Sequence, residues 1–391
     1  APEPPAIHQN SRPSPTPTAL MRSPSLRSTL FLLIGLATSA SAQTFQQRAQ
    51  AVLDSVYRTD TTMVGLMLHV EAPDRGIAWS GASGRSAKGG EALHPEAPVL
   101  IASNIKTYVS ATILRLVEEG KLTIDQPVGP LLTGPTRALF ASDGYDLQAI
   151  TLTHLLTHTS GVDSYNLYGF MDSVIANPQH RWTRDEQLTR TVVLGHKLAE
   201  PGAHYAYADA NYLLLTEVIE GLTGMPFTQA MRQLLRYEQM GYTHTWMPTL
   251  EPMPTGTLPL VHQYWDERHT DSHTIDISMD LYGGGGIACT TADLARFNQH
   301  LFTGKVVHDP AVLASIRTTV VTQDSVQSGY QLGITPQRIR NRPAFGHGGF
   351  WGTEVLYFPE LNATVSIAVL ERGHRALRHS VMERIVALME Q

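Results

Sequence analysis

Apolar and polar positions along the chain predict strands near both ends and helices in between. Residues 44–58 repeat apolar positions at helical intervals, and 63–71 and 76–83 alternate as two strands joined by a short polar turn. Because strands from both ends can share one sheet, we expect an antiparallel sheet with helices on both faces. The predicted C-terminal segments are strands at 329–335, 344–348, 353–358 and 363–370 and a closing helix at 374–390.

The middle of the chain is mostly helical or loop. Four glycines at 283–286 make a flexible turn, and Thr290 or Thr291 then caps a helix that runs through Phe302. The other predicted helices are 103–119, which Gly120 ends, 213–222 and 227–237. We therefore expect an α/β fold whose α/β part covers 43–110 and 283–391 and carries an inserted all-helical subdomain, 111–282.

The N-terminal residues do not follow this pattern. Residues 1–20 are rich in Pro and Ser, which predicts a disordered leader. From Met21 to Ala42, a basic start, an apolar run at 30–37 and an A-x-A sequence predict a secretory signal peptide that is too short to span a membrane. We therefore expect an exported protein, periplasmic or extracellular, with a mature domain at 43–391. A membrane-tethering anchor is the alternative.

Composition narrows the class of protein. Of the 391 residues, 42% are hydrophobic and 16% are charged, which excludes a disordered chain. The net charge of −6 and the lack of any basic run argue against a nucleic-acid binder. The single cysteine, Cys289, rules out an internal disulfide and a cysteine-based zinc site. No apolar run after residue 42 is long enough for an integral membrane segment.

The first candidate for chemistry is the S-x-x-K sequence of Ser103 and Lys106. On a helix these positions share a face, and Ser103 at the helix start meets free N–H groups and the positive end of the dipole. Desolvation on this apolar helix would favour a neutral Lys106 that takes the Ser103 proton. The alternative is a capping serine followed by a surface lysine.

Two further groups carry candidate residues. Tyr207 and Asp209 lie in a loop before a helix, where a tyrosine beside a lysine can act as a base and a carboxylate can pair with that lysine. The alternative is a buried tyrosine-rich loop with Asp209 as a helix cap.

In the second group, a histidine with small neighbours on an edge strand would let a substrate backbone lie alongside, and the next N–H would serve as an oxyanion donor. Its residues are His347, Gly348, Gly349 and Phe350, and its alternative is a glycine-rich hairpin turn.

The order S-x-x-K, then Y-x-N/D, then H-x-G resembles the serine β-lactamase and penicillin-binding-protein superfamily. Within it, the chain is similar to the branch of class C β-lactamases, D-alanyl-D-alanine carboxypeptidases, D-aminopeptidases and β-lactamase-like esterases. The likeness runs from about residue 45 to the C-terminus and includes 150–162, 284–287 and 291–294. It implies a β-lactamase/transpeptidase-like fold and a serine hydrolase that needs no metal or cofactor.

The resemblance also implies roles for the candidate residues. Ser103 would be the acylated nucleophile, and Lys106 its proton acceptor or electrostatic activator. Tyr207 would be the general base and acid, and His347 would orient the substrate and help polarise Tyr207. The oxyanion hole would be formed by the N–H groups of Ser103 and Phe350, and the substrate-binding residues would include Asp209, Gly348 and Gly349.

The sequence departs from the family pattern at Asp209 and at Ala208, which stands where the family often has Ser, and from the class C pattern at His347. Asp209 stands where the family often has Asn, and a carboxylate cannot donate to a substrate amide. His347 stands where class C β-lactamases have Lys. We therefore expect a secreted hydrolase of D-alanyl or D-amino-acid peptides or of esters. A class C-like β-lactamase and a non-catalytic protein that binds peptides or penicillin are the alternatives, and the oligomeric state is open.

Other residues fit chemistry less well. His154 and His158 have zinc-like spacing but lack the Glu of H-E-x-x-H, and the histidines at 262, 269 and 273 fall in a polar loop typical of solvated surface. The absence of G-x-S-x-G excludes the α/β-hydrolase route. The aromatic candidates for a pocket are Tyr165, Tyr168, Phe170, Tyr282, Phe350 and Trp351.

Overall fold

Six antiparallel strands, two from the start of the chain and four from its end, form the main sheet. Its order is β2-β1-β11-β10-β9-β8, so the N-terminal hairpin joins the C-terminal meander through β1 and β11. The prediction that both ends share one sheet is confirmed. The strands are β1 (Gly65–Ala72), β2 (Ile77–Gly84), β8 (Thr335–Ile339), β9 (Arg342–Gly348), β10 (Thr353–Phe358) and β11 (Ala363–Val369).

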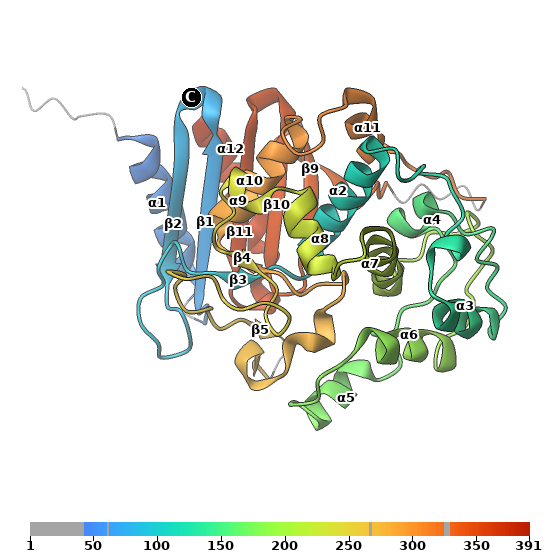
Figure 1. The fold of residues 1–391 in the computed structure, drawn as a ribbon. Coiled ribbons are helices and arrows are strands. Elements are labelled where there is room, and N and C mark those ends of the chain that lie inside the picture. Colours follow the sequence, from blue (N-terminus) through green and yellow to red (C-terminus); the bar gives the residue numbers. More distant parts are fainter. Residues whose placement is uncertain (1–42, 61, 266–267, 324–328) are drawn as a thin grey trace, which may run out of the picture. The chain divides into compact units, whose positions relative to one another are not determined.

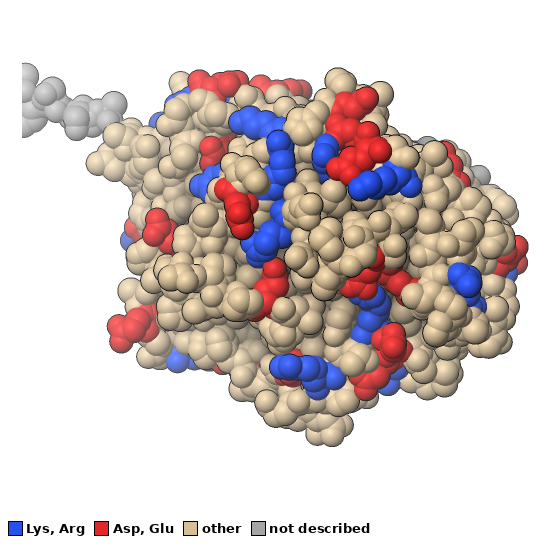
Figure 2. Space-filling model, in the orientation of Figure 1, with Lys and Arg blue, Asp and Glu red and all other residues tan. Residues whose placement is uncertain are grey.

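The computed structural model describes residues 43–60, 62–265, 268–323 and 329–391 (Figure 1). The leader at 1–20 and the signal peptide predicted from Met21 to Ala42 lie outside the described residues. Within the described ranges, no helix has the length and apolar character needed to cross a bilayer. On the face drawn in Figure 2, basic and acidic side chains are interspersed rather than gathered by sign.

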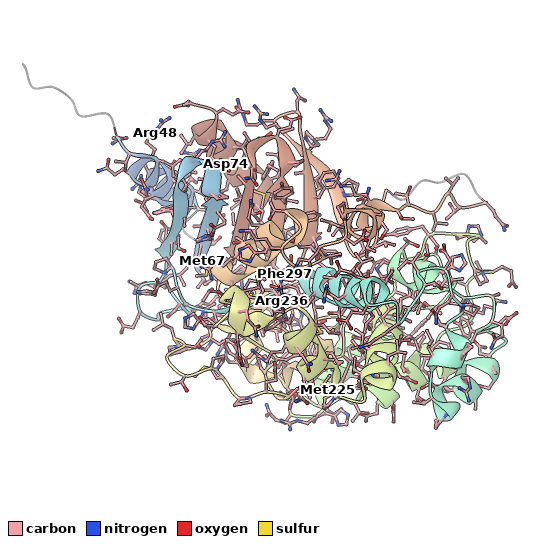
Figure 3. All side chains as sticks on the ribbon, turned by 45° about the horizontal axis from the view of Figure 1, so that its top comes forward. Arg48, Met67, Asp74, Met225, Arg236 and Phe297 are labelled. Atoms are coloured by element: carbon pink, nitrogen blue, oxygen red, sulfur yellow. The ribbon has the colours of Figure 1, made fainter. Side chains whose placement is uncertain are left out.

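Alternation along β1 gives the sheet two apolar faces. Leu66, Leu68 and Val70 belong to one buried cluster, which helices α1 (Phe45–Thr59) and α12 (Leu377–Met389) cover. Met67 points to the other face and belongs to the larger cluster with Phe297 of helix α10 (Thr291–Phe302); Figure 3 labels both residues. Thr290 caps α10 by accepting from the Asp293 N–H, as the sequence predicts.

Helix α2 (Ile105–Glu118) lies between the sheet and the helical part of the molecule (Figure 1). Eleven of its residues are buried, so it is a core helix rather than a surface one. It packs against α7 (Asp209–Thr223) and α8 (Phe227–Leu234). A separate small sheet has the order β3-β7-β4, and its first strand comes shortly before α2 in the chain. Its strands have two residues each: β3 (Val99–Leu100), β7 (Ala288–Cys289) and β4 (Thr245–Trp246).

The segment 111–282 also holds the remaining helices and one short hairpin. The helices are α3 (Gly134–Ala141), α4 (Leu152–Leu156), α5 (Phe170–Ala176), α6 (Arg184–Val193) and α9 (Tyr237–Met240), and the hairpin strands are β5 (Tyr264–Trp265) and β6 (Thr270–Asp271). The predicted helix 227–237 is divided, because Arg236 takes a left-handed φ of 54° between α8 and α9. A further short helix, α11 (Pro310–Ala314), follows α10.

The strand predicted at 329–335 is wrong. β8 begins at Thr335, and the apolar residues before it, Leu332 and Ile334, are buried against α2 without pairing to a neighbouring strand. Side chains of α2 satisfy this backbone instead, since Ser110 Oγ donates to the Leu332 carbonyl and Thr107 Oγ1 to the Gly333 carbonyl. Apolar spacing alone does not distinguish such a core-lining loop from a strand.

Candidate active site

Ser103 lies in a tight turn between β3 and α2. The residue before it, Ala102, has a left-handed φ of 45°, a conformation that costs an L-residue free energy. The neighbouring Asn104 holds this turn, because its Nδ2 donates to the Ile101 carbonyl at 2.6 Å and to Thr353 Oγ1 of β10 at 2.8 Å. The sheet therefore fixes the position of Ser103.

Lys106 lies one turn further along and is fully buried. Its Nζ lies 3.1 Å from Ser103 Oγ, 2.6 Å from Asp209 Oδ1 and 2.7 Å from the Gly284 carbonyl. Three acceptors match the three N–H donors of an ammonium, and the carboxylate compensates the charge. The prediction placed Lys106 on an apolar face, whereas the structure gives it a carboxylate partner and two further oxygen acceptors.

Asp209 is the first residue of α7 and has a fixed orientation. Its Oδ1 accepts from Lys106, its Oδ2 accepts from Asn166 Nδ2 at 2.6 Å, and its N–H donates to Ser164 Oγ at 3.3 Å. Both carboxylate oxygens therefore have partners. The carboxylate–lysine pairing expected for Asp209 is present in the structure.

The Tyr207 hydroxyl hydrogen-bonds Ser103, while Lys106 faces its ring, with Nζ 5.0 Å from the ring centroid. Tyr207 is 39% exposed, but desolvation of its hydroxyl and then the charge of Asp209 raise the pKa of Tyr207 well above its usual value. The resting tyrosine is therefore a neutral phenol. A tyrosine that acts as a base beside Lys106 must therefore pass on its own proton as it takes another, because desolvation and the charge of Asp209 disfavour a free phenolate.

His347 is buried, and both of its ring nitrogens have partners. Burial and the charge of Lys106 lower its pKa to about 3, so the ring is neutral. Nδ1 lies 2.6 Å from the Gly348 carbonyl and Nε2 lies 2.9 Å from the Tyr330 hydroxyl, which makes Nδ1 the donor and Nε2 the acceptor. Its ring centroid is 6.4 Å from that of Tyr207. The side-chain hydrogen bond of His347 therefore goes to Tyr330, a residue that no sequence pattern identified, and its contact with Tyr207 is between the two rings.

The end of β9 forms an open edge beside Ser103. β8 pairs with β9 only as far as Gly346, so the segment from His347 onward is beyond the end of β8. A Cβ on Gly349 would come within 2.3 Å of the Ile101 carbonyl, whereas one on Gly348 would meet nothing closer than 3.5 Å. Gly349 is thus required for close packing against the Ser103 turn. No acceptor for the Phe350 N–H exists among the described residues, as an oxyanion donor requires.

A cavity of about 190 Å³ opens beside Ser103. Of the six aromatic candidates, Tyr165, Phe170 and Phe350 line it. The other three do not: Trp351 is 2% exposed and packs on Trp265, while Tyr168 and Tyr282 lie elsewhere. The lining residues are Ser103, Tyr165, Asn166, Phe170, Met171, Tyr207, Asp209, Met279, Asp280 and Phe350.

Asp280 is a pocket residue that sequence reasoning missed. Its carboxylate lies against the glycine turn, where a Cβ on Gly285 would come within 2.2 Å of Asp280 Oδ2. Gly284 similarly lies against Asp209, since a Cβ on Gly284 would be 3.2 Å from the Asp209 Cβ. The glycines predicted as a flexible turn therefore let two carboxylates approach the backbone. Burial, and then the charge of Asp209, raise the pKa of Asp280 to about 8, against the opposing effect of Lys106.

None of the histidines considered as metal ligands is among the residues that line this pocket. Among the described residues, only His262, Asp271 and His273 bring metal-binding atoms together, within 4.8 Å of one another. His154 instead takes part in the cap of α4 with Thr151. His158 is buried, with its ring centroid 4.2 Å from that of Tyr207.

A serine held against a lysine ammonium, at the start of a buried helix beside an antiparallel sheet, places the protein among the serine hydrolases. The sequence model of the Beta-lactamase family matches residues 43–382. The chain belongs to that family, and the expected β-lactamase/transpeptidase-like fold is confirmed.

Relatives within this family carry different activities in their names. The chain is 24% identical over 201 residues to the D-alanyl-D-alanine-carboxypeptidase/endopeptidase AmpH of Escherichia coli K12, covering 51% of this chain and 48% of AmpH. It is 30% identical over 209 residues to esterase EstB of Burkholderia gladioli, covering 51% of each. The chain thus spans about half the length of these curated relatives.

The fold matches solved structures over most of its length. The D-amino acid amidase of Ochrobactrum anthropi SV3, complexed with L-phenylalanine, superposes with a TM-score of 0.72 at 19% identity, covering 88% of this chain and 98% of the amidase. This likeness shows the shared fold.

Proposed function

We propose that this protein is an exported serine hydrolase that forms an acyl-enzyme at Ser103 and acts on peptides or amides of the D-alanyl or D-amino-acid type, or on esters. The observation that carries the proposal is the contact of the Lys106 ammonium with Ser103 Oγ at 3.1 Å. The names of AmpH, EstB and the amidase support this range of substrates. The predicted signal peptide supports export.

Acylation begins with attack of Ser103 Oγ on the substrate carbonyl carbon. The Ser103 proton passes to the Tyr207 oxygen while the phenol proton passes to the leaving nitrogen or oxygen, so the tyrosine relays protons without becoming a free phenolate. A C–O bond forms and the bond to the leaving group breaks. The Lys106 ammonium stabilises the charge that develops on Ser103 Oγ.

The N–H groups of Ser103 and Phe350 bind the carbonyl oxygen as it becomes an oxyanion. Water then takes the place of the leaving group. It gives one proton to Tyr207 while its oxygen attacks the acyl carbon. The bond between the acyl carbon and Ser103 Oγ then breaks, Tyr207 returns a proton to Oγ, and the carboxylic acid product leaves. In this scheme His347 is a positioning residue that acts through the Tyr330 hydroxyl.

Two alternatives are less well supported. A class C-like β-lactamase would use an Asn amide where Asp209 offers only acceptors, and both of these acceptors already have partners. A non-catalytic binding protein has no need of a buried ammonium directed at a serine hydroxyl, because burial of that charge costs free energy.

Intact-mass measurement after incubation with a fluorophosphonate tests the proposal. We expect one adduct on the wild type and none on Ser103→Ala, with Ser142→Ala on the exposed end of α3 as the control that still labels. An adduct that persists in Ser103→Ala would refute the nucleophile assignment. Parallel incubation with benzylpenicillin distinguishes the alternatives: a lasting adduct favours a penicillin-binding peptidase, and rapid turnover favours a β-lactamase.

A further inference from the structure

The charges around the pocket are not balanced. Its lining contains two carboxylates, Asp209 and Asp280, and no Lys or Arg. The neighbouring ammonium of Lys106 bonds to Asp209, which also accepts from Asn166. Lys106 is therefore the one cation near two carboxylates, and its three hydrogen bonds go to Ser103, Asp209 and Gly284 rather than to Asp280.

Asp280 has no partner within the described part of the chain. Its Oδ2 is shielded from water and accepts no hydrogen bond, although a buried carboxylate oxygen normally has one. The turn that follows holds the carboxylate in place, because Gly285 leaves room for it where any Cβ would collide. Asp280 also lines the substrate cavity. A carboxylate at the cavity wall that bonds to no other described residue is complementary to a donor on the ligand.

We propose that Asp280 binds a protonated amine on the acyl part of the substrate, so that the enzyme prefers amino-acid amides, peptides and esters with a free amino group over their N-acylated forms. This proposal rests on the proposed function, because it assigns the substrate class of the same site. The cavity is small, at about 190 Å³, which suits a single amino-acid residue.

The surroundings favour a cation over a neutral donor. Asp280 is desolvated and repelled by Asp209, so its ionised form is destabilised in the empty site, and its pKa rises to about 8. An ammonium removes both penalties by pairing with Asp280 while lying near the charge of Asp209. The apolar residues Phe170, Met171 and Met279 on the lining supply contact for the substrate side chain.

The test compares two ester substrates that differ only at the amine. The ethyl esters of D- and L-phenylalanine carry an ammonium, and their N-acetyl forms do not. For Asp280→Asn we expect kcat/KM on the free-amine ester to fall by about 10- to 100-fold, mainly through KM, while the N-acetyl ester changes by less than about threefold.

Two further variants separate selectivity from general damage. Asp276→Asn changes a carboxylate on the same short helical turn and keeps a side-chain oxygen for the Ser278 N–H that Asp276 caps, so it should retain wild-type selectivity. Gly285→Ala keeps the charge of Asp280 but displaces the carboxylate, and it should lose selectivity as Asp280→Asn does. A ratio of the two kcat/KM values that is the same in Asp280→Asn and the wild type would overturn the proposal, as would a wild-type preference for the N-acetyl ester.

Fluorophosphonate labelling distinguishes failure of this proposal from failure of the proposed function. If wild type and Asp280→Asn both label at Ser103 but show the same ester selectivity, the amine site is wrong and the serine hydrolase stands. If the wild type does not label at Ser103, the proposed function fails and the amine site fails with it.

Discussion

Lys106 and Asp209 form a buried ion pair, with 2.6 Å between Nζ and Oδ1, and the same ammonium donates to Ser103 Oγ. The pair joins α2 to the first turn of α7, so the orientation of the nucleophile depends on how these two helices pack. It also gives the fully buried Lys106 side chain a carboxylate partner.

Removal of the lysine should affect stability and reactivity together. Lys106→Met leaves Asp209 buried without its cation, so we expect a loss of about 3–5 kcal/mol in the free energy of unfolding. Addition of Asp209→Asn should recover part of that loss without restoring fluorophosphonate labelling. Urea unfolding and intact mass measure the two effects. A stable, fully reactive Lys106→Met protein would contradict the role of the pair.

Asp209→Asn alone should make the site more reactive toward β-lactams. The amide can donate to a substrate carbonyl, and loss of the charge removes one cause of the raised pKa of Tyr207. We expect the rate of acylation by benzylpenicillin to rise by about 10-fold or more, as measured by the penicilloyl adduct over time. An unchanged rate would show that Asp209 does not exclude β-lactams.

The raised pKa of Asp280 predicts a pH-dependent stability. Because the folded-state pKa of about 8 exceeds the ordinary 3.8, folding favours the protonated form, and stability falls as pH rises from about 4 to 8. Asp280→Asn removes this loss. We therefore expect the free energy of unfolding of the variant to exceed that of the wild type by about 1–3 kcal/mol at pH 8.5 and by less at pH 5. Urea unfolding of substrate-free protein at both pH values tests this. A difference that does not change with pH would contradict it.

His347 should not control the acid side of the activity profile. Burial and Lys106 lower its pKa to about 3, so its ring stays neutral from pH 5 upward. We expect His347→Gln to lower kcat/KM but to keep the wild-type acid limb, and Tyr330→Phe to lower stability by about 1 kcal/mol through the lost hydrogen bond. If an acid limb near pH 6–7 disappears in His347→Gln, the neutral assignment is wrong.

The glycine pair after His347 offers a matched steric test. Gly349→Ala would force a Cβ against the Ile101 carbonyl and Thr353 Oγ1. We therefore expect the free energy of unfolding to fall by several kcal/mol and fluorophosphonate labelling of Ser103 to decrease. Gly348→Ala has ordinary contacts at that position and should change stability by less than about 1 kcal/mol. Thermal melts of the two variants compare them directly; equal stability would contradict the tight packing.

Local sequence patterns were sufficient to predict those features of the structure that depend on residues close together in the chain. The hairpin of β1 and β2, the Thr290 cap and the shared face of Ser103 and Lys106 each follow from spacing along the chain. The full set of partners of Lys106 did not follow, because the Gly284 carbonyl that accepts from it lies 178 residues away along the chain.

The sequence did not predict the site residues whose positions depend on tertiary packing. Tyr330 and Asp280 carry no local motif, and their positions depend on loops that pack against α2 and the glycine turn. A carboxylate shortly before four glycines was the available signal for Asp280. The sequence alone could not show that the turn folds back onto that carboxylate.

The segment 280–285 has two tasks, since the Gly284 carbonyl accepts from Lys106 and Gly285 makes room for Asp280. In the proposed mechanism, substrate preference and the reactivity of Ser103 are therefore coupled through this turn. A substitution that reshapes this turn to admit a different acyl group also changes the hydrogen bonding of the activating lysine. New specificities should arise more readily through the segment 165–171, whose Tyr165, Phe170 and Met171 line the same cavity without bonding to Lys106.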